Sequence, residues 1–109
     1  MRRFPVLAML LAGISMSAAA DDPPRIEVTI SNHSFRPAEI HVPAGKPVVL
    51  VVTNKDVVPE EFDSSALKVE KVIMGGTYGT IRLRPLGPGR YPFMGEFHPD
   101  TAKGVVVAE

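Results

Sequence analysis

Apolar and polar side chains alternate in several short segments of this chain, and the alternation predicts β-strands. Ile26, Val28 and Ile30 are separated by single polar residues, which is the period-two pattern of a strand with one buried face. The same pattern occurs at residues 40–42 and 77–84. These three segments are therefore predicted to be half-buried strands.

Further strands are predicted on other grounds. Residues 47–53 contain the continuous apolar run VVLVV, which is typical of a strand buried on both faces. Short strands are also expected around Phe62, at residues 91–93 and at residues 104–108. Residues 65–71 are expected to form a single helical turn or a loop.

Glycine and proline mark the connections between these segments. The chain has 11 prolines and 9 glycines, and turn-forming sequences fall at residues 43–46, 54–56 and 85–89. Residues 31–37 are expected to form a loop. About seven or eight short strands with frequent turns predict an all-β sandwich or small barrel.

The first 20 residues are predicted to be an export signal that is removed. Arg2 and Arg3 precede an apolar stretch at residues 4–16, and three alanines follow at residues 18–20. A positive start, a short apolar core and small residues at the cleavage site are the parts of a signal peptide. We therefore expect a periplasmic protein with one domain, residues 21–109.

Composition excludes several kinds of chemistry. The chain has no cysteine, so disulfides, Cys-ligated zinc, iron–sulfur clusters and thiol catalysis are absent. Its 12 basic and 12 acidic side chains balance, which gives no electrostatic route to nucleic acid. No pairing of a nucleophile with a base is recognisable, although weak ferroxidase activity stays open.

Three segments together resemble the cupredoxins, small copper proteins with a Greek-key β-sandwich. They are FRPAEIHVPAG at residues 35–45, PEEF at residues 59–62, and PGRYPFMGEFH at residues 88–98. In the family's motif, Glu60 stands at the first histidine, Gly95 at the cysteine and His98 at the second histidine. A blue copper centre needs a thiolate with two imidazoles, so no type 1 copper is expected.

Within the cupredoxins, the pattern is most similar to the EfeO-type domain. That subgroup occurs in periplasmic components of bacterial iron-uptake systems, including small subunits that stand beside an iron permease. The resemblance implies a protein that handles iron, copper or both. It also implies an iron permease, or another periplasmic component of iron uptake, as the partner.

Most candidate metal ligands lie in two segments that this fold brings to one end, and His33 lies in the loop at residues 31–37, which is expected to approach the same end. Carboxylates and imidazole without thiolate suit Fe, Mn, Zn or Cu(II). The primary candidates are Glu60, Glu96 and His98, and the secondary ones are Glu61, Glu70, Met94 and His33. Each has an ordinary alternative: Glu60, Glu96 and His98 as surface residues, Glu61 or Glu70 paired with Lys68 or Lys71, and Met94 in packing. His41, out of phase with its apolar neighbours, is expected on the surface.

Three functions follow from these patterns. The first is a metal-binding accessory that delivers iron or oxidises Fe(II) for a permease. The second is a metal-free docking module for a membrane partner, in which exposed apolar residues such as Phe97 make the contact. The third is a Cu(I) chaperone, which is disfavoured because only Met74 and Met94 remain after the signal is removed.

Overall fold

The computed structural model describes residues 22–109, and these form nine β-strands. The signal peptide predicted for residues 1–20 lies outside the described residues. In chain order the strands are β1 Arg25–Ser31, β2 Ser34–Arg36, β3 Glu39–Val42, β4 Val48–Asn54, β5 Glu60–Ser64, β6 Val69–Ile73, β7 Tyr78–Leu83, β8 Gly89–Gly95 and β9 Lys103–Ala108. Within residues 22–109 no helix is long and apolar enough to cross a membrane.

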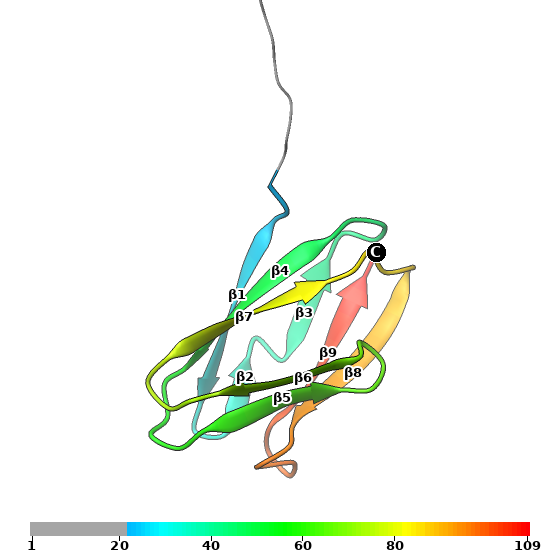
Figure 1. Ribbon diagram of the computed structural model, residues 1–109. Coiled ribbons are helices and arrows are strands. Elements are labelled where there is room, and N and C mark those ends of the chain that lie inside the picture. Colours follow the sequence, from blue (N-terminus) through cyan, green and yellow to red (C-terminus); the bar gives the residue numbers. More distant parts are fainter. Residues whose placement is uncertain (1–21) are drawn as a thin grey trace, which may run out of the picture.

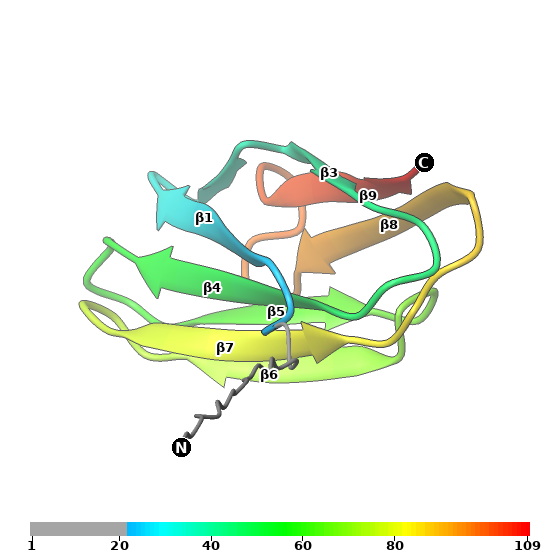
Figure 2. The same ribbon diagram turned by 90° about the horizontal axis from the view of Figure 1, so that it is seen from above.

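The strands form two sheets that pack face to face (Figures 1 and 2). One sheet has the order β2-β1-β4-β7, and the other has the order β3-β9-β8-β5-β6. β1 pairs in parallel with β4, and β3 pairs in parallel with β9, while the other pairs are antiparallel. The predicted all-β sandwich is confirmed.

Two strands were missed by the sequence patterns. β2 lies in the segment expected to be a loop, and it is only three residues long. β6 begins at Val69, within the segment expected to be a helical turn or loop at residues 65–71, and extends to Ile73. Three consecutive residues of β6 are exposed, because it is the edge strand of its sheet and is not covered on both faces. Its sequence therefore lacks the alternation that identifies a strand.

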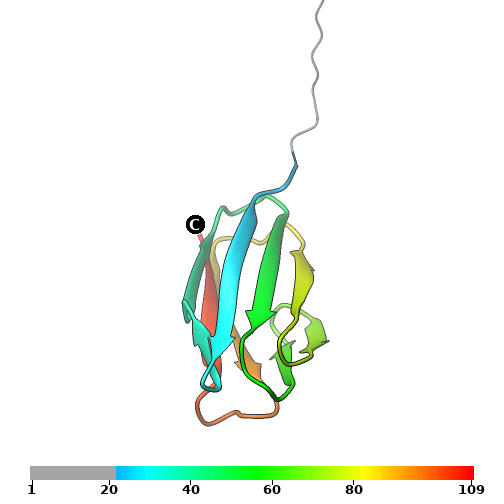
Figure 3. The same cartoon turned by 90° about the vertical axis from the view of Figure 1, so that its left-hand side faces the viewer.

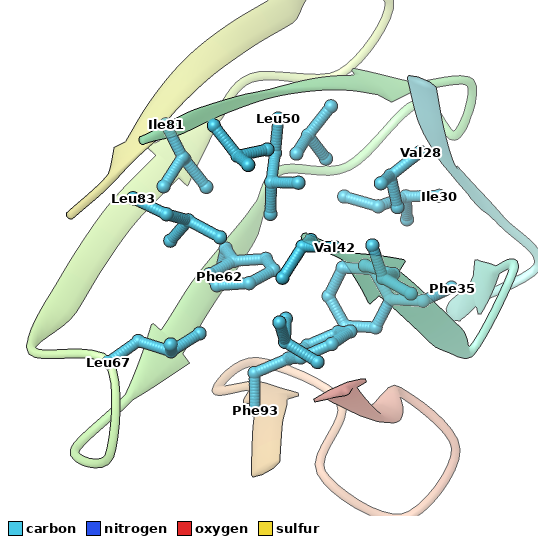
Figure 4. Close-up of a cluster of buried hydrophobic side chains, with 14 of the residues drawn as sticks. Val28, Ile30, Phe35, Val42, Leu50, Phe62, Leu67, Ile81, Leu83 and Phe93 are labelled. Atoms are coloured by element: carbon cyan, nitrogen blue, oxygen red, sulfur yellow. The ribbon is translucent and has the colours of Figure 1, made fainter. Parts of the chain in front are cut away.

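The core lies between the sheets and contains three phenylalanines from three different strands. The ring centroid of Phe35 lies 5.7 Å from that of Phe62 and 4.9 Å from that of Phe93, in edge contacts. Phe62 and Phe93 stack at 4.5 Å. Figure 4 shows Phe62 and Phe93 beneath aliphatic side chains of the β2-β1-β4-β7 sheet, the sheet to which Phe35 itself belongs. The burial of these aromatic and aliphatic side chains is the main contribution to the stability of a domain that has no disulfides.

Pro92 limits the pairing between β5 and β8. These strands pair only at Phe62 with Gly95 and at Asp63 with Met94. Pro92 has no N–H to continue the ladder, and its carbonyl instead accepts a hydrogen bond of 2.7 Å from Ser64 Oγ. The strands separate beyond this point and leave an open groove of about 710 Å³ on the surface.

Candidate functional site

Three connections meet at the end of the sandwich that lies away from the C-terminus (Figure 3). They are the turn between β1 and β2, the segment between β4 and β5, and the loop between β8 and β9. A hydrogen bond of 2.6 Å from Thr101 Oγ1 to the carbonyl of His33 joins the first to the third. This end carries most of the predicted site residues.

Glu60 and His98 come together at this end, as predicted. Glu60 is 1% exposed, so its expected alternative as a surface side chain is wrong. Its Oε2 lies 2.6 Å from His98 Nδ1, and its Oε1 accepts hydrogen bonds from the backbone N–H groups of Glu61 (3.0 Å) and Phe97 (2.9 Å). A carboxylate only accepts, so His98 donates from Nδ1. Three donors thus satisfy a carboxylate that would be costly to bury alone.

His33 covers the other side of this pair. Its ring stacks on that of His98 with centroids 3.8 Å apart and planes 13° apart. His33 Nδ1 lies 3.5 Å from Asp56 Oδ2. It makes no hydrogen bond there, and in residues 22–109 it is the one buried side-chain nitrogen or oxygen without a partner. The predicted approach of His33 to this end is confirmed.

The backbone of the β1–β2 turn is held by Asp56. Asn32 and His33 both adopt left-handed conformations, with φ of 53° and 56°, which are unusual for residues other than glycine. The Asp56 carboxylate accepts hydrogen bonds from the N–H groups of Asn32 (2.8 Å) and His33 (2.9 Å). These bonds, that from His33 above all, lower the pKa of Asp56. Asp56 therefore keeps the His33 ring against His98.

The space around Gly95 shows whether a cupredoxin copper centre fits at this end of the sandwich. A Cβ atom at Gly95 would lie 2.6 Å from the Glu60 carboxyl carbon and 2.6 Å from Ala102 Cβ. Real Cβ atoms do not approach this closely, so the space of a cysteine side chain is already filled. The residues present do not fit a blue copper site.

The imidazoles of His33 and His98 do not converge on one ion. A metal bonds to a histidine nitrogen in the plane of its ring at about 2.0–2.1 Å. In two nearly parallel stacked rings these directions run side by side and do not meet. In the part of the chain that the structure describes, no group of three or more His, Asp or Glu side chains is arranged to hold a metal ion.

Glu96 lies apart from Glu60 and His98 and belongs to a second group of carboxylates. It shares the outer face of the β5–β6–β8 sheet with Glu61, Asp63 and Glu70. The hydrogen bond with Asp63, followed by desolvation and by repulsion from the neighbouring carboxylates, raises the pKa of Glu96. Partial burial and the neighbouring carboxylates raise the pKa of Glu61. We call these four residues the acidic cluster.

The acidic cluster has no basic partner in the described residues. No ion pair joins Glu61 or Glu70 to Lys68 or Lys71 among residues 22–109, so the expected alternative of a surface salt bridge is wrong. The groove beside β8 is lined by Asp63 and Glu70 together with Lys68 and Met94. Met94 is 36% exposed, so it lies at this surface and not in the core.

Asp56 is the residue of this end that sequence patterns missed. Its sequence neighbours marked only a turn, and its partners lie 23 and 24 residues earlier. Nothing in the sequence connects Asp56 to the turn that carries His33.

Comparison with known proteins identifies the family of this fold. Residues 4–108 match the cupredoxin-like domain. The chain belongs to this family. An uncharacterised protein of Rickettsia prowazekii (strain Madrid E) is 39% identical over 82 residues, which are 75% of this chain and 66% of that protein. The match thus covers slightly less than two thirds of that relative.

Solved structures of cupredoxins share the sandwich. Auracyanin A, a blue copper protein from Chloroflexus aurantiacus, has a TM-score of 0.66 and 16% identity, over 79% of this chain and 99% of its own. The metal-binding domain of the Cu(I)-exporting ATPase CopA of Streptococcus pneumoniae D39, solved with Cu(I), has a TM-score of 0.68 and 18% identity, over 84% and 92%. At these identities the similarity establishes the fold alone.

The third histidine, His41, lies at the opposite end of the domain. Its exposed position is confirmed, with 53% of the side chain accessible. Nδ1 lies 2.8 Å from Glu109 Oε2 and Nε2 lies 2.9 Å from Glu39 Oε2. The hydrogen bond with Glu109 is the largest cause that raises the pKa of His41. Both ring nitrogens are thus engaged in a contact between β3 and the C-terminal residue.

Proposed function

We propose that this protein is a periplasmic accessory of a bacterial iron-uptake system and binds iron as its cargo. Membership of the cupredoxin-like family and the resemblance to the EfeO-type domain support this proposal. The partner is an iron permease or another periplasmic component of the same system. The observation that carries the proposal is the acidic cluster.

The acidic cluster has the chemistry of a site for a hard cation. Carboxylate oxygens suit Fe(III) and other hard ions better than thiophilic metals. In the described structure, Glu61, Asp63, Glu70 and Glu96 repel one another, and no lysine or arginine pairs with them. No three of these side chains are already arranged around an ion in the part of the chain that the structure describes, so a bound cation would have to draw the oxygens together, and in doing so it would remove their repulsion. Cu(II), which also accepts oxygen ligands, is the alternative ion.

Iron retention tests the proposal directly. The purified protein is incubated with Fe(III) citrate, desalted and analysed for iron and protein. We expect a stoichiometric amount of retained iron, and we expect Asp63→Asn/Glu96→Gln to weaken binding by roughly tenfold or more because two charged ligands are lost.

A matched control removes the same number of carboxylates elsewhere. Asp22 and Glu27 are exposed and lie outside the acidic cluster, so Asp22→Asn/Glu27→Gln should retain as much iron as the wild type. Equal retention by both double variants would contradict the assignment of the cluster. Absence of iron in the wild-type protein would contradict iron binding itself.

A second candidate function, docking on a membrane partner, is favoured by the exposed apolar residues near the same end. Val57 is 94% exposed, Met74 58% and Phe97 46%. Buried Asn54 fixes the two loops that carry the first two, since its amide donates to the carbonyls of Val58 (2.9 Å) and Ile73 (3.0 Å). Apolar side chains held rigidly in solvent are typical of interaction surfaces.

The two functions predict different variants to be harmful. If metal-free docking is the function, Val57→Ser/Phe97→Ser should impair growth on limiting iron in cells that depend on this protein, and the purified wild-type protein should retain no iron. If iron binding is the function, Asp63→Asn/Glu96→Gln should impair both growth and iron retention. Wild-type growth with both sets of variants would contradict both candidates.

A further inference from the structure

We propose that the carboxylate of Glu60 takes the place of a metal ion in this cupredoxin sandwich, and that the Glu60–His98 pair closes the metal end without a metal. The proposal concerns the interior of the domain and is independent of iron binding at the acidic cluster. It rests on four observations: the burial of Glu60, its three hydrogen bonds, the lack of space at Gly95, and the stacking of His33 on His98.

The position of Glu60 is central to the argument. Glu60 is buried on the same side of β5 as Phe62, and its carboxyl group lies between Gly95, at the end of β8, and His98. These are the positions at which the cupredoxin pattern places a cysteine and a histidine. The carboxyl group therefore lies among the residues that would surround a metal.

The hydrogen bonds of Glu60 connect β5 to the loop that follows β8. Glu60 begins β5, while Phe97 N–H and His98 Nδ1 belong to the loop after β8. A metal ion would join the same segments by binding ligands from each. Here one side chain makes these connections with hydrogen bonds, and the donor groups satisfy its negative charge.

The geometry leaves no place for an ion between the two residues. Metal–nitrogen and metal–oxygen bonds of about 2.0–2.2 Å require the two atoms to be about 3 Å apart or more. Glu60 Oε2 and His98 Nδ1 are 2.6 Å apart, which is the distance of a charge-assisted hydrogen bond. An ion could enter only by breaking this bond.

The absence of a side chain at Gly95 is part of the same arrangement. Its hypothetical Cβ would lie 2.8 Å from Glu60 Oε2 as well as 2.6 Å from the carboxyl carbon. Glycine at this position and glutamate at position 60 therefore depend on each other. A cysteine could replace Gly95 only if the Glu60 carboxyl group moved away.

Nitrogen-15 NMR of the histidine rings tests the proposal in the intact protein. We expect His98 to be the Nδ1–H tautomer, and we expect its ring resonances to stay unchanged when Zn(II), a diamagnetic ion, is added. This result is expected even if Zn(II) binds the carboxylates of the acidic cluster. A Zn(II)-dependent shift of the His98 ring nitrogens with loss of the Nδ1–H signal would overturn the proposal.

Two substitutions give independent readouts. Glu60→Gln places an amide that can donate toward the ring, so His98 should change to the Nε2–H tautomer, whereas the exposed control Glu27→Gln should leave it unchanged. Glu60→Ala leaves two partly buried N–H groups and the His98 Nδ1–H without an acceptor, and we expect its Tm to fall by about 10–25 °C. An unchanged tautomer in Glu60→Gln, or an unchanged Tm in Glu60→Ala, would also overturn the proposal.

The proposal of iron binding and the proposal for the Glu60–His98 pair can be contradicted independently of each other. Loss of iron retention in Asp63→Asn/Glu96→Gln concerns the outer face of the sheet, while the His98 tautomer reports on its inner side. A wild-type protein that retains no iron but keeps the Nδ1–H tautomer in Zn(II) would contradict only the proposed function.

Discussion

Glu60 Oε2 lies 2.6 Å from His98 Nδ1, although the two residues are 38 positions apart in the chain. The contact joins a fully buried carboxylate on β5 to a partly exposed imidazole in the loop after β8. A buried charge of this kind is stable only when its partners are fixed in place. The closely packed surroundings of Glu60 should therefore be sensitive to small changes in volume.

Gly95→Ala tests this sensitivity with a single methyl group. The new Cβ would lie 2.6 Å from both Ala102 Cβ and the Glu60 carboxyl carbon, so we expect the free energy of unfolding to fall by about 1–3 kcal/mol. Urea denaturation measures the change. The control is Gly87→Ala, whose Cβ would meet nothing closer than 3.9 Å and which should change stability by about 0.5 kcal/mol or less.

The same substitution in the Glu60→Ala background separates the two contacts. If the Glu60 carboxyl group is the obstacle, Gly95→Ala should be less destabilising there than in the wild type, because the closest oxygen and carbon are gone. Equal destabilisation in both backgrounds would show that Ala102 alone opposes the methyl group.

Asn54→Ala should destabilise the same end by a different route. Asn54 is fully buried, its amide donates to the Val58 and Ile73 carbonyls, and its Oδ1 accepts a 2.9 Å bond from Asp56 N–H. Alanine would leave one buried and two partly buried backbone groups without these partners, so we expect a loss of about 2–4 kcal/mol in the free energy of unfolding. Chemical denaturation measures it, with exposed Lys55→Ala as the control. A loss below that of the control variant would show that water replaces the amide.

Much of the fold could be predicted from sequence, because strands with one buried face carry a local signal. β1, β3 and β7 have that signal in alternation, and β4 has it in its continuous apolar run. β6 has no such signal, since its exposure depends on being at the edge of the sheet. Edge position is a property of the whole topology and is not encoded in five residues.

The candidate site could be predicted only in part. Glu60 lies two residues before Phe62 and therefore shares its side of the strand, and the structure buries both. The two backbone N–H groups that make this burial tolerable become available only after the β8–β9 loop has folded against β5. Glu96 has the same parity as His98, yet its carboxyl group bonds to Asp63 on the outer face. The alternation of side-chain directions along a strand does not continue through an irregular loop.

The pH dependence of stability above pH 6.5 should depend on His41. Its pKa is raised from 6.5 by the hydrogen bond to Glu109 and by Glu39, so the folded state binds the proton more tightly than the unfolded state. This contribution is fully present below pH 6.5 and is lost as the pH rises through the folded value. Arg90, 4.0 Å from Glu39, is the remaining charged group at this contact.

Thermal unfolding measured at pH values from below 6.5 upward tests whether His41 causes this pH dependence. The wild-type Tm should decrease as the pH rises past the folded pKa of His41, and His41→Gln should remove that decrease. The same decrease in both proteins would assign the effect to another group.

Asp56 should control how the stability of the protein changes at low pH. Its pKa is lowered from 3.8, chiefly by the hydrogen bond from the His33 N–H. The associated stability is present above pH 3.8 and is lost as the pH falls through the lowered folded value. Asp56→Asn should therefore reduce the acid-induced loss of Tm, as measured by circular dichroism. An equally steep loss in the variant would contradict this role.

The acidic cluster should oppose stability while it supports binding. The pKa values of Glu61 and Glu96 are raised from 4.5, so their ionised forms destabilise the folded state above that pH. Asp63→Asn removes the negative charge that both of them face. The variant without metal should therefore unfold at a higher temperature than the wild type, and it should retain less Fe(III). Stabilisation without loss of iron would mean that the cluster is only a strained surface, whereas loss of both would mean that Asp63 has a structural role.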